Sequence, residues 1–296
     1  MSSRSFVMLV VAGVCWGTGG VTGRALSEVG GLSAPAVAAY RLLIGGALLV
    51  VVLAVRRRRP RGGAAWRRVL AVAGLAAVFQ ASYFSAVAVS SVTISTLIAI
   101  GSAPLLVLAV DAVTTRRLPE RATIRPVLLG LTGLALLVGA PTGQSLGRTL
   151  AGVGLSLVAG AGFALLTLLG RRPVDGLDEA TTTGYGFLLG GTGLLLALGT
   201  SADLGVRLSL TSLGLLALLG TVPTALAYTL YFRGLRSSTA VTATVVALLE
   251  PLTATVLAVA LLGERLSVPA AVGAVVLLIS VVDSGRRREP LTTVAT

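Results

Sequence analysis

The most constraining feature of this sequence is a succession of apolar segments, each about as long as a membrane-spanning helix. An α-helix needs about 20 apolar residues to cross the hydrocarbon core of a bilayer. The segments that meet this length lie at residues 5–24, 34–55, 67–88, 92–114, 124–141, 149–170, 181–200, 211–232, 238–262 and 267–284. The expected fold class is therefore an all-α integral membrane protein with ten transmembrane helices.

The overall composition excludes a soluble globule. Of 296 residues, 55% are hydrophobic and 12% are charged, with a mean hydropathy of +0.94. An ordinary globular domain carries roughly 25% charged residues. The 37 glycines suit helices that approach one another closely within lipid.

The basic residues lie in short connectors between the apolar segments. The net charge is +13, and all 24 basic residues are arginine. With a cytoplasmic N-terminus, 19 arginines fall on the cytoplasmic side and four on the other. Since cytoplasmic loops are enriched in arginine and lysine, we expect a multi-pass protein of the cell (inner) membrane with both termini in the cytoplasm. The same distribution argues against nucleic-acid binding.

Several features recur at one offset, which indicates an internal duplication. Pairs of residues 147 positions apart are Gly13 and Gly160, Arg24 and Arg171, Ser90 and Ser237, and Pro104 and Pro251. The expected units are residues 1–147 and 148–296. Because each unit holds five spans, an odd number, the second must enter the membrane inverted with respect to the first.

Short motifs at span ends carry a family resemblance. They are Tyr-Arg-Leu-Leu at 40–43, Ala103-Pro104, Glu250-Pro251, and Leu-Gly-Glu-Arg-Leu at 262–266. Together with the two five-span halves, these elements resemble the EamA-like branch of the drug/metabolite transporter superfamily. The resemblance implies a secondary transporter, often an exporter of amino acids or related metabolites. The first half departs from the pattern at 116–121, and the second half has no arginine matching Arg41.

The sequence offers little for enzyme chemistry. It has no histidine and one cysteine, Cys15, so neither a disulfide nor a Cys/His metal site is expected, and no cofactor is predicted. We interpret the glycine cluster at 17–23 as helix packing. The acidic residues Asp175, Asp178 and Glu179 are interpreted as a solvated connector. A membrane-embedded enzyme acting on lipid or isoprenoid substrates is the alternative from another class, and a passive channel is a third.

Two ionisable residues fall inside spans and are candidate functional groups, because such residues are costly in the membrane. Arg41 lies about 10 Å below the outer surface and Glu250 about 18 Å above the inner one, at 1.5 Å per residue. They therefore lie at similar depths. Three alternatives remain: they form a structural ion pair, Glu250 contacts substrate or carries a proton, or the charges face an unrelated water pocket. Asp111 and Asp283, near span ends, are expected to pair with arginines at 116–117 and 286–288.

Two prolines lie near the middles of spans and are candidate helix-break or gating positions. Pro104 and Pro251 each leave a carbonyl without its usual partner, on Ile100 and Ala247 respectively. Such carbonyls need a neighbour or a watery cavity, so the two spans are expected to line the central path.

Polar and aromatic residues on facing spans complete the predicted substrate site. The substrate-binding candidates are Trp16, Arg41, Gln80, Tyr83, Thr96, Phe163, Tyr228, Thr242 and Glu250. The predicted function is secondary active transport of small organic solutes by alternating access, with export of amino acids or related metabolites and with proton coupling as one option. The expected partners are that solute and the lipid bilayer, and the chain is expected to be a monomer.

Overall fold

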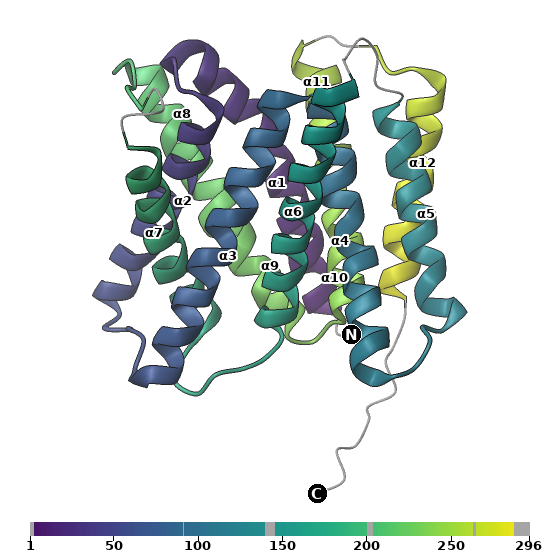
Figure 1. Cartoon of the computed structure of the whole chain (residues 1–296), viewed down its shortest axis with the longest axis horizontal. Coiled ribbons are helices and arrows are strands. Elements are labelled where there is room, and N and C mark those ends of the chain that lie inside the picture. Colours follow the sequence, from purple (N-terminus) through teal and green to yellow (C-terminus); the bar gives the residue numbers. More distant parts are fainter. Residues whose placement is uncertain (1–2, 91, 140–145, 200–203, 263–264, 287–296) are drawn as a thin grey trace, which may run out of the picture.

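The computed structural model describes residues 3–90, 92–139, 146–199, 204–262 and 265–286, and its named elements are all helices. They pack side by side as one bundle (Figure 1). Their bounds are α1 Ser3–Gly30, α2 Ala34–Val55, α3 Gly62–Val89, α4 Val92–Thr115, α5 Arg121–Val138, α6 Leu146–Gly170, α7 Glu179–Leu198, α8 Leu210–Gly220, the π-helix η1 Thr221–Leu226, α9 Ala227–Leu235, α10 Ala240–Ala247, α11 Leu249–Leu262 and α12 Val268–Gly285.

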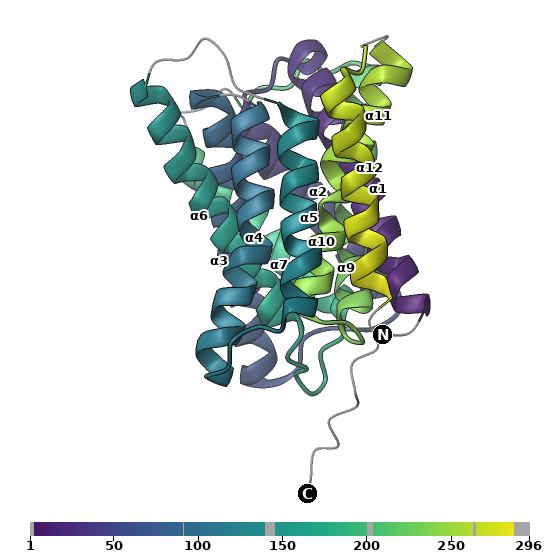
Figure 2. The same cartoon turned by 90° about the vertical axis from the view of Figure 1, so that its right-hand side faces the viewer.

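One end of the bundle collects the arginine-bearing connectors 56–61, 116–120 and 171–178 (Figures 1 and 2). We call it the arginine-rich end, and its opposite the arginine-poor end. Helix α1 begins and α12 ends at the arginine-rich end. Successive spans alternate in direction, so that α1 runs away from this end and α6 runs toward it.

The expected spans fall on helices of the structure, and two of them fall on more than one helical element. In the described part of the chain, nine helical segments are long and apolar enough to cross a membrane. Helix α7 is 20 residues long but is not among them, since threonine, glycine and tyrosine lower its hydropathy. Two expected spans are interrupted: 211–232 is divided into α8, η1 and α9, and 238–262 into α10 and α11.

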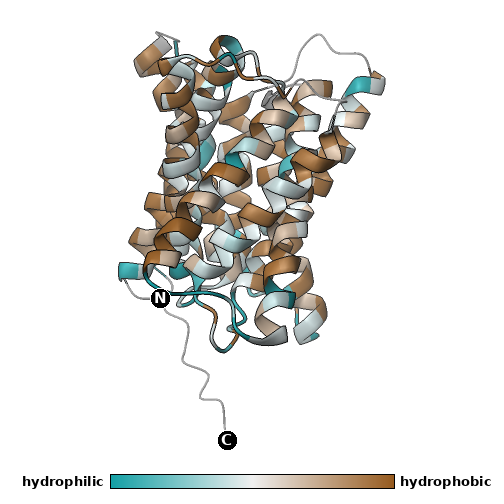
Figure 3. Cartoon of the chain, turned by 90° about the vertical axis from the view of Figure 1, so that its left-hand side faces the viewer, coloured by the Kyte–Doolittle hydropathy of each residue, from teal (hydrophilic) through white to brown (hydrophobic). Residues whose placement is uncertain are grey.

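The outer surface of the bundle suits a bilayer. Large apolar side chains such as Val51, Leu70 and Leu196 are more than half exposed. Hydrophobic residues dominate the middle of the helices, and hydrophilic residues gather toward the ends (Figure 3). The chain is therefore a multi-pass membrane protein.

Glycines set how closely the helices approach. A Cβ on Gly17 of α1 would overlap the side chain of Thr253 and lie 2.8 Å from the carbonyl oxygen of Glu250. A Cβ on Gly19 would lie 3.2 Å from the ring of Pro223 in η1. These contacts agree with the packing interpretation of the glycine cluster at 17–23.

Candidate functional site

The guanidinium of Arg41 is buried inside the bundle, with 7% of the residue exposed. Its Nε donates a hydrogen bond to Thr224 Oγ1 at 3.1 Å, and its Nη2 donates to the carbonyl oxygen of Pro223 at 3.0 Å. Helix α2 of the first half of the chain is thereby bonded to η1 of the second half. No other hydrogen bond joins Arg41 to the described residues, so Nη1 remains available to a ligand.

The π-helical segment that receives Arg41 follows from Pro223. Proline has no N–H, so the carbonyl of Leu219, four residues earlier, loses its usual partner. The hydroxyl of Thr224 donates to that carbonyl at 2.7 Å instead. Sequence reasoning missed both residues, although a proline in the middle of the span 211–232 was the signal for an irregular backbone.

The carboxylate of Glu250 lies beside a second interruption of the helical backbone. Helix α10 ends at Ala247 and α11 begins at Leu249, so the break directly precedes Glu250 and Pro251. Glu250 is half-buried and has no hydrogen bond or ion pair with the described residues. An acid within the bundle is thus left without a protein partner.

Arg41 and Glu250 do not form the direct ion pair that was one of the three expectations. The ion pairs in the described part of the chain, at N–O separations up to 4.0 Å, do not include them. They still interact electrostatically, and both act on the phenol groups of Tyr83 and Tyr228. These four groups therefore surround one region of the interior.

An aromatic cluster lies next to these charged groups. Trp16 contacts Phe163 edge-on at a centroid distance of 5.6 Å and Tyr228 at 4.9 Å. It also contacts Tyr231 at 4.9 Å, a ring that the sequence analysis did not select. The hydroxyl of Tyr231 bonds Thr167 at 2.8 Å. The position of Tyr231, three residues after Tyr228 on one helix, was a usable signal.

Two buried polar atoms in this region have no hydrogen-bond partner. They are the indole Nε1 of Trp16, a donor, and the amide Oε1 of Gln80, an acceptor. The amide nitrogen of Gln80 donates to the hydroxyl of Tyr228 at 3.3 Å, so both unpaired atoms belong to residues that touch Tyr228. Buried polar atoms without partners are uncommon and call for an explanation such as a ligand or water.

Ring contacts, hydrogen bonds and electrostatic interactions link eight of the nine predicted substrate residues to one another. Trp16 and Gln80 contact Tyr228, and Phe163 contacts Trp16. The hydroxyl of Tyr83 shares a 2.9 Å hydrogen bond with Thr96. Tyr83 and Tyr228 then interact electrostatically with both Arg41 and Glu250.

Thr242 is the exception. Its backbone N–H bonds Thr239 Oγ1 at 2.9 Å in the N-cap of α10, which begins at the arginine-rich end. The side chain accepts a second 2.9 Å bond from the same hydroxyl. Thr242 thus takes part in the start of a helix, and the break at Leu248 interrupts the helical stripe that linked it to Glu250.

Pro104 and Pro251, the two candidate gating prolines, are buried, so neither faces lipid. Helix α4 continues through Pro104, whereas the backbone is interrupted three residues before Pro251. The equivalent prolines therefore have different local effects. In the second half, the single residue Leu248 interrupts the helical hydrogen bonding between α10 and α11 beside the charged groups.

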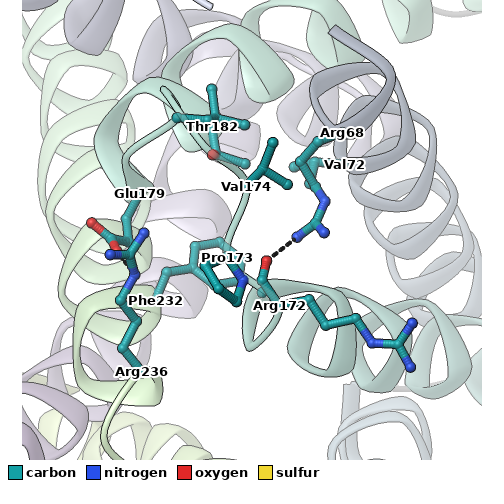
Figure 4. A pocket seen from close by; sticks show the side chains of 11 residues that line it. Arg68, Val72, Arg172, Pro173, Val174, Glu179, Thr182, Phe232 and Arg236 are labelled. Atoms are coloured by element: carbon teal, nitrogen blue, oxygen red, sulfur yellow. Dashed lines mark hydrogen bonds and ion pairs between the residues drawn. The ribbon is translucent and has the colours of Figure 1, made fainter. Parts of the chain in front are cut away.

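Charged side chains join the two halves of the chain at the arginine-rich end. Arg58 bonds Asp178 at 2.6 Å, and Arg125 bonds Asp283 with its Nε at 3.1 Å from Oδ2. Figure 4 shows Arg68 donating to the carbonyl oxygen of Arg172, at 2.8 Å, beside a pocket of about 30 Å³.

The ionic contacts at the arginine-rich end correct two expectations from the sequence, of which the first concerns the acidic residues of the connector 171–178. The connector acids are not merely solvated: Asp178 caps α7 through Thr181 N at 2.7 Å, and Glu179 pairs with Arg236. Burial alone would raise the pKa of Asp178, but the bonds from Thr181 and Arg58 hold that pKa below its ordinary value.

The two span-end acids also have contacts that the sequence did not predict or lack contacts that it did. Asp283 pairs with Arg125 of α5, because α5 and α12 pack against each other. Asp111 forms no ion pair with Arg116 or Arg117 in the described part of the chain. The remaining expected partners, residues 287–288, lie outside the described residues.

The fold and the interior define a class of protein. A bundle of membrane-spanning helices that holds buried ionisable and aromatic groups between the two halves of its chain, beside interrupted helices, has the architecture of a membrane transporter. A solved crystal structure superposes on it with a TM-score of 0.82, at 18% identity, covering 97% of this chain and 99% of that one, which shows a shared fold.

Sequence comparisons identify the family. The EamA-like transporter family matches residues 3–139 and again residues 150–283. The uncharacterized transporter YwfM of Bacillus subtilis is 30% identical over 261 residues, covering 88% of this chain and 86% of that protein. An uncharacterized transporter of Clostridium kluyveri is 27% identical over 180 residues, 58% of each chain. The chain belongs to the EamA-like transporter family.

Proposed function

We propose that this protein is a secondary active transporter that exports amino acids or related small metabolites by alternating access. The observation that carries the proposal is the pair of opposite charges, Arg41 and Glu250, held within one region of the interior without touching each other. Charges removed from water are costly unless paired. A zwitterionic solute between them supplies both missing partners, its carboxylate to Arg41 and its ammonium to Glu250.

The surrounding groups support a solute with polar and apolar parts. Arginine suits a carboxylate because its planar guanidinium can donate two parallel hydrogen bonds. The unpaired atoms Trp16 Nε1 and Gln80 Oε1 supply one further donor and one acceptor. Phe163 and Tyr231 add aromatic surface to the same region.

Alternating access is supported by the arrangement of the two halves. We infer two inverted five-helix repeats, residues 1–147 and 148–296, since α1 and α6 run in opposite directions and the family matches each half. Tyr83, Thr96 and Glu250 keep a small exposed fraction, whereas Trp16 and Tyr231 are buried. With the ionic contacts at the arginine-rich end, this favours a conformation closed at that end.

The arginine count supports the orientation of the chain. We infer that the arginine-rich end faces the cytoplasm, which places both termini there. Export then requires the contacts Arg58–Asp178 and Arg125–Asp283 to open, so that solute enters from the cytoplasm. Both halves of the site belong to one chain, so a monomer is sufficient.

Counterflow in proteoliposomes tests this function. We expect exchange of a labelled amino acid against unlabelled amino acids, with saturation, and little exchange against the corresponding decarboxylated amine or deaminated acid. Arg41→Gln should lose the preference for the amino acid over its amine. Thr229→Val is the matched control, because the Thr229 hydroxyl has no partner.

Three results would oppose the proposal. Flux without saturation would indicate a passive channel. Chemical conversion of lipid or isoprenoid substrates would indicate a membrane enzyme. An unchanged preference for the amino acid in Arg41→Gln would remove Arg41 from the binding site.

A further inference from the structure

A groove of about 520 Å³ lies between α3, α4 and α6 near the arginine-rich end. Its walls include Leu75, Val110 and Leu165, and the last two are 38% and 47% exposed on the outside of the bundle. Apolar side chains on the outside of a membrane-spanning bundle face acyl chains. The groove is therefore suited to a lipid chain rather than to a solute from water.

Two arginines line this groove where α6 ends. Arg171 and Arg172 directly follow the last residue of α6, and both are exposed. The carbonyl oxygen of Arg172 is fixed by the bond from Arg68, while its guanidinium extends away from the pocket lined by Glu179 and Arg236 (Figure 4). Neither guanidinium has an ion pair or a side-chain hydrogen bond among the described residues.

The groove also contains an acid. Asp111 of α4 lines it and is half-buried. Its carboxylate has no hydrogen bond or ion pair with the described residues, since the bonds from Thr114 and Thr115 go to its backbone carbonyl oxygen. The groove thus presents two unpaired cations and one unpaired anion above an apolar wall.

A second groove on the bundle provides a comparison. It measures about 590 Å³, lies between α5 and α12, and is lined by Arg125, Asp283 and Arg286. Here Arg125 already bonds Asp283, so the protein satisfies most of these charges itself. In the α3–α4–α6 groove, the charged side chains have no such partner among the described residues and remain available to a bound ligand.

We propose that the α3–α4–α6 groove binds phosphatidylethanolamine from the membrane leaflet at the arginine-rich end. The phosphate binds Arg171 and Arg172, the ammonium donates to Asp111, and an acyl chain lies along Leu75 and Leu165. Guanidinium groups recognise phosphate through paired hydrogen bonds, and basic clusters at the membrane surface attract lipid phosphates. Phosphatidylglycerol offers Asp111 only neutral hydroxyl donors and no positive charge, and the quaternary ammonium of phosphatidylcholine has no N–H to donate.

Native mass spectrometry of the full chain in mild detergent tests the proposal. The probes are palmitoyl-oleoyl phosphatidylethanolamine, phosphatidylcholine and phosphatidylglycerol, each added at increasing concentration. We expect phosphatidylethanolamine adducts at the lowest concentration. The double variant Arg171→Gln/Arg172→Gln should bind this lipid roughly tenfold more weakly, since each arginine contributes to the attraction.

Two further variants make the test specific. Arg117→Gln/Arg121→Gln removes the same charge from exposed positions outside the groove and should bind lipid as the unchanged protein does. Asp111→Asn should bind phosphatidylethanolamine and phosphatidylcholine equally. A thermal shift on adding phosphatidylethanolamine should occur in the unchanged protein and disappear in Arg171→Gln/Arg172→Gln.

Any of three outcomes would overturn the proposal. The first is phosphatidylglycerol binding as tightly as phosphatidylethanolamine in the unchanged protein. The second is equal binding by the Arg171→Gln/Arg172→Gln and Arg117→Gln/Arg121→Gln variants. The third is a dimer that persists while lipid is displaced and that the Arg171→Gln/Arg172→Gln variant abolishes, which would show that a second copy of the chain covers the groove.

Discussion

Arg41 in α2 donates a hydrogen bond from Nε to Thr224 Oγ1 in η1, so a buried cation of the first half holds an irregular backbone segment of the second. Thr224 also donates to the carbonyl of Leu219, which Pro223 leaves without a backbone donor. The Thr224 hydroxyl therefore both positions Arg41 in the candidate site and stabilises the irregular helix in which Thr224 lies. A movement of α2 relative to α8 and α9 would break the bond from Arg41 and leave the bond from Thr224 to Leu219 in place.

Replacing Thr224 tests this double role. Thr224→Val keeps the shape of the side chain but leaves the Leu219 carbonyl and Arg41 Nε unsatisfied, so we expect a loss of about 1 to 3 kcal/mol in stability. Thr229→Val removes a buried hydroxyl without a partner and should be neutral or stabilising. Thermal unfolding in detergent measures both. Equal melting temperatures for the two variants would contradict the assigned role of Thr224.

The contact between α2 and α7 should depend on Gly46. A Cβ there would overlap the backbone of Leu188, which no rotamer change can relieve. We expect Gly46→Ala to cost about 3 kcal/mol or more. Gly74→Ala is the control, since a Cβ on Gly74 meets nothing within 4 Å and alanine favours a helix by about 0.5 to 1 kcal/mol. Similar melting temperatures for the two variants would show that α2 and α7 are not in close contact.

The connector acid Asp178 should contribute stability in a pH-dependent way. Because its pKa is lower in the folded protein than its ordinary value near ~3.9, the contribution is complete above that ordinary value and is lost as the pH falls through the folded pKa. We expect Asp178→Asn to be less stable than the unchanged protein at pH 7, by about 0.2 to 1 kcal/mol for a partly exposed pair.

The comparison at acidic pH completes this test. The difference in melting temperature between Asp178→Asn and the unchanged protein should shrink as the pH falls below the ordinary aspartate pKa and through the lower folded pKa, because Asp178 then becomes protonated. Asp175→Asn, at an exposed position of the same connector without a partner in the structure, should show little difference at either pH. A deficit of Asp178→Asn that is constant with pH would rule out the ionic contribution.

Glu250 is the candidate proton carrier. Because its carboxylate forms no bond with the described residues, Glu250→Gln should fold. Without the charge opposite the solute ammonium it should exchange solute with a higher KM, and it should lose any acceleration of transport by a pH gradient. The measurement is solute efflux from proteoliposomes with and without that gradient, and Glu120→Gln, at an exposed residue preceding α5, is the control. Unchanged pH dependence would exclude proton coupling through Glu250, and failure to fold would favour a structural role.

The proposed orientation can be tested with two glycine positions. Single cysteines at Gly63 and Gly147, in a Cys15→Ala background, should be labelled from opposite sides, Gly63 from the cytoplasm. A Cβ meets nothing within 4 Å at either position, whereas the neighbouring Gly62 has φ of +80° and resists substitution. Labelling of both cysteines from one side would refute the order of the spans.

Much of the candidate site could be predicted from the sequence because its residues are exceptional within apolar segments. A charged residue such as Arg41 or Glu250 is costly in lipid wherever its helix packs, so position in the chain is enough to select it. Equivalent positions in the two halves of the chain also selected Trp16 and Phe163 as candidates, and the rings of these two residues are in contact in the structure. Thr242 shows the limit of this reasoning, since a helical stripe assumes an uninterrupted helix.

The sequence by itself determined the long apolar spans, the end of the bundle at which the arginines gather, and the family. These properties depend on segment length, local composition and motifs, which neighbouring helices do not alter. Only the tertiary structure decided that Arg41 bonds η1, that Arg125 pairs with Asp283, and that Glu250 has no hydrogen bond or ion pair with the residues that the structure describes. The reason is physical: lipid-facing and protein-facing apolar residues look alike in sequence, so the choice of neighbouring helix is made by close packing at glycines and by a few buried polar contacts.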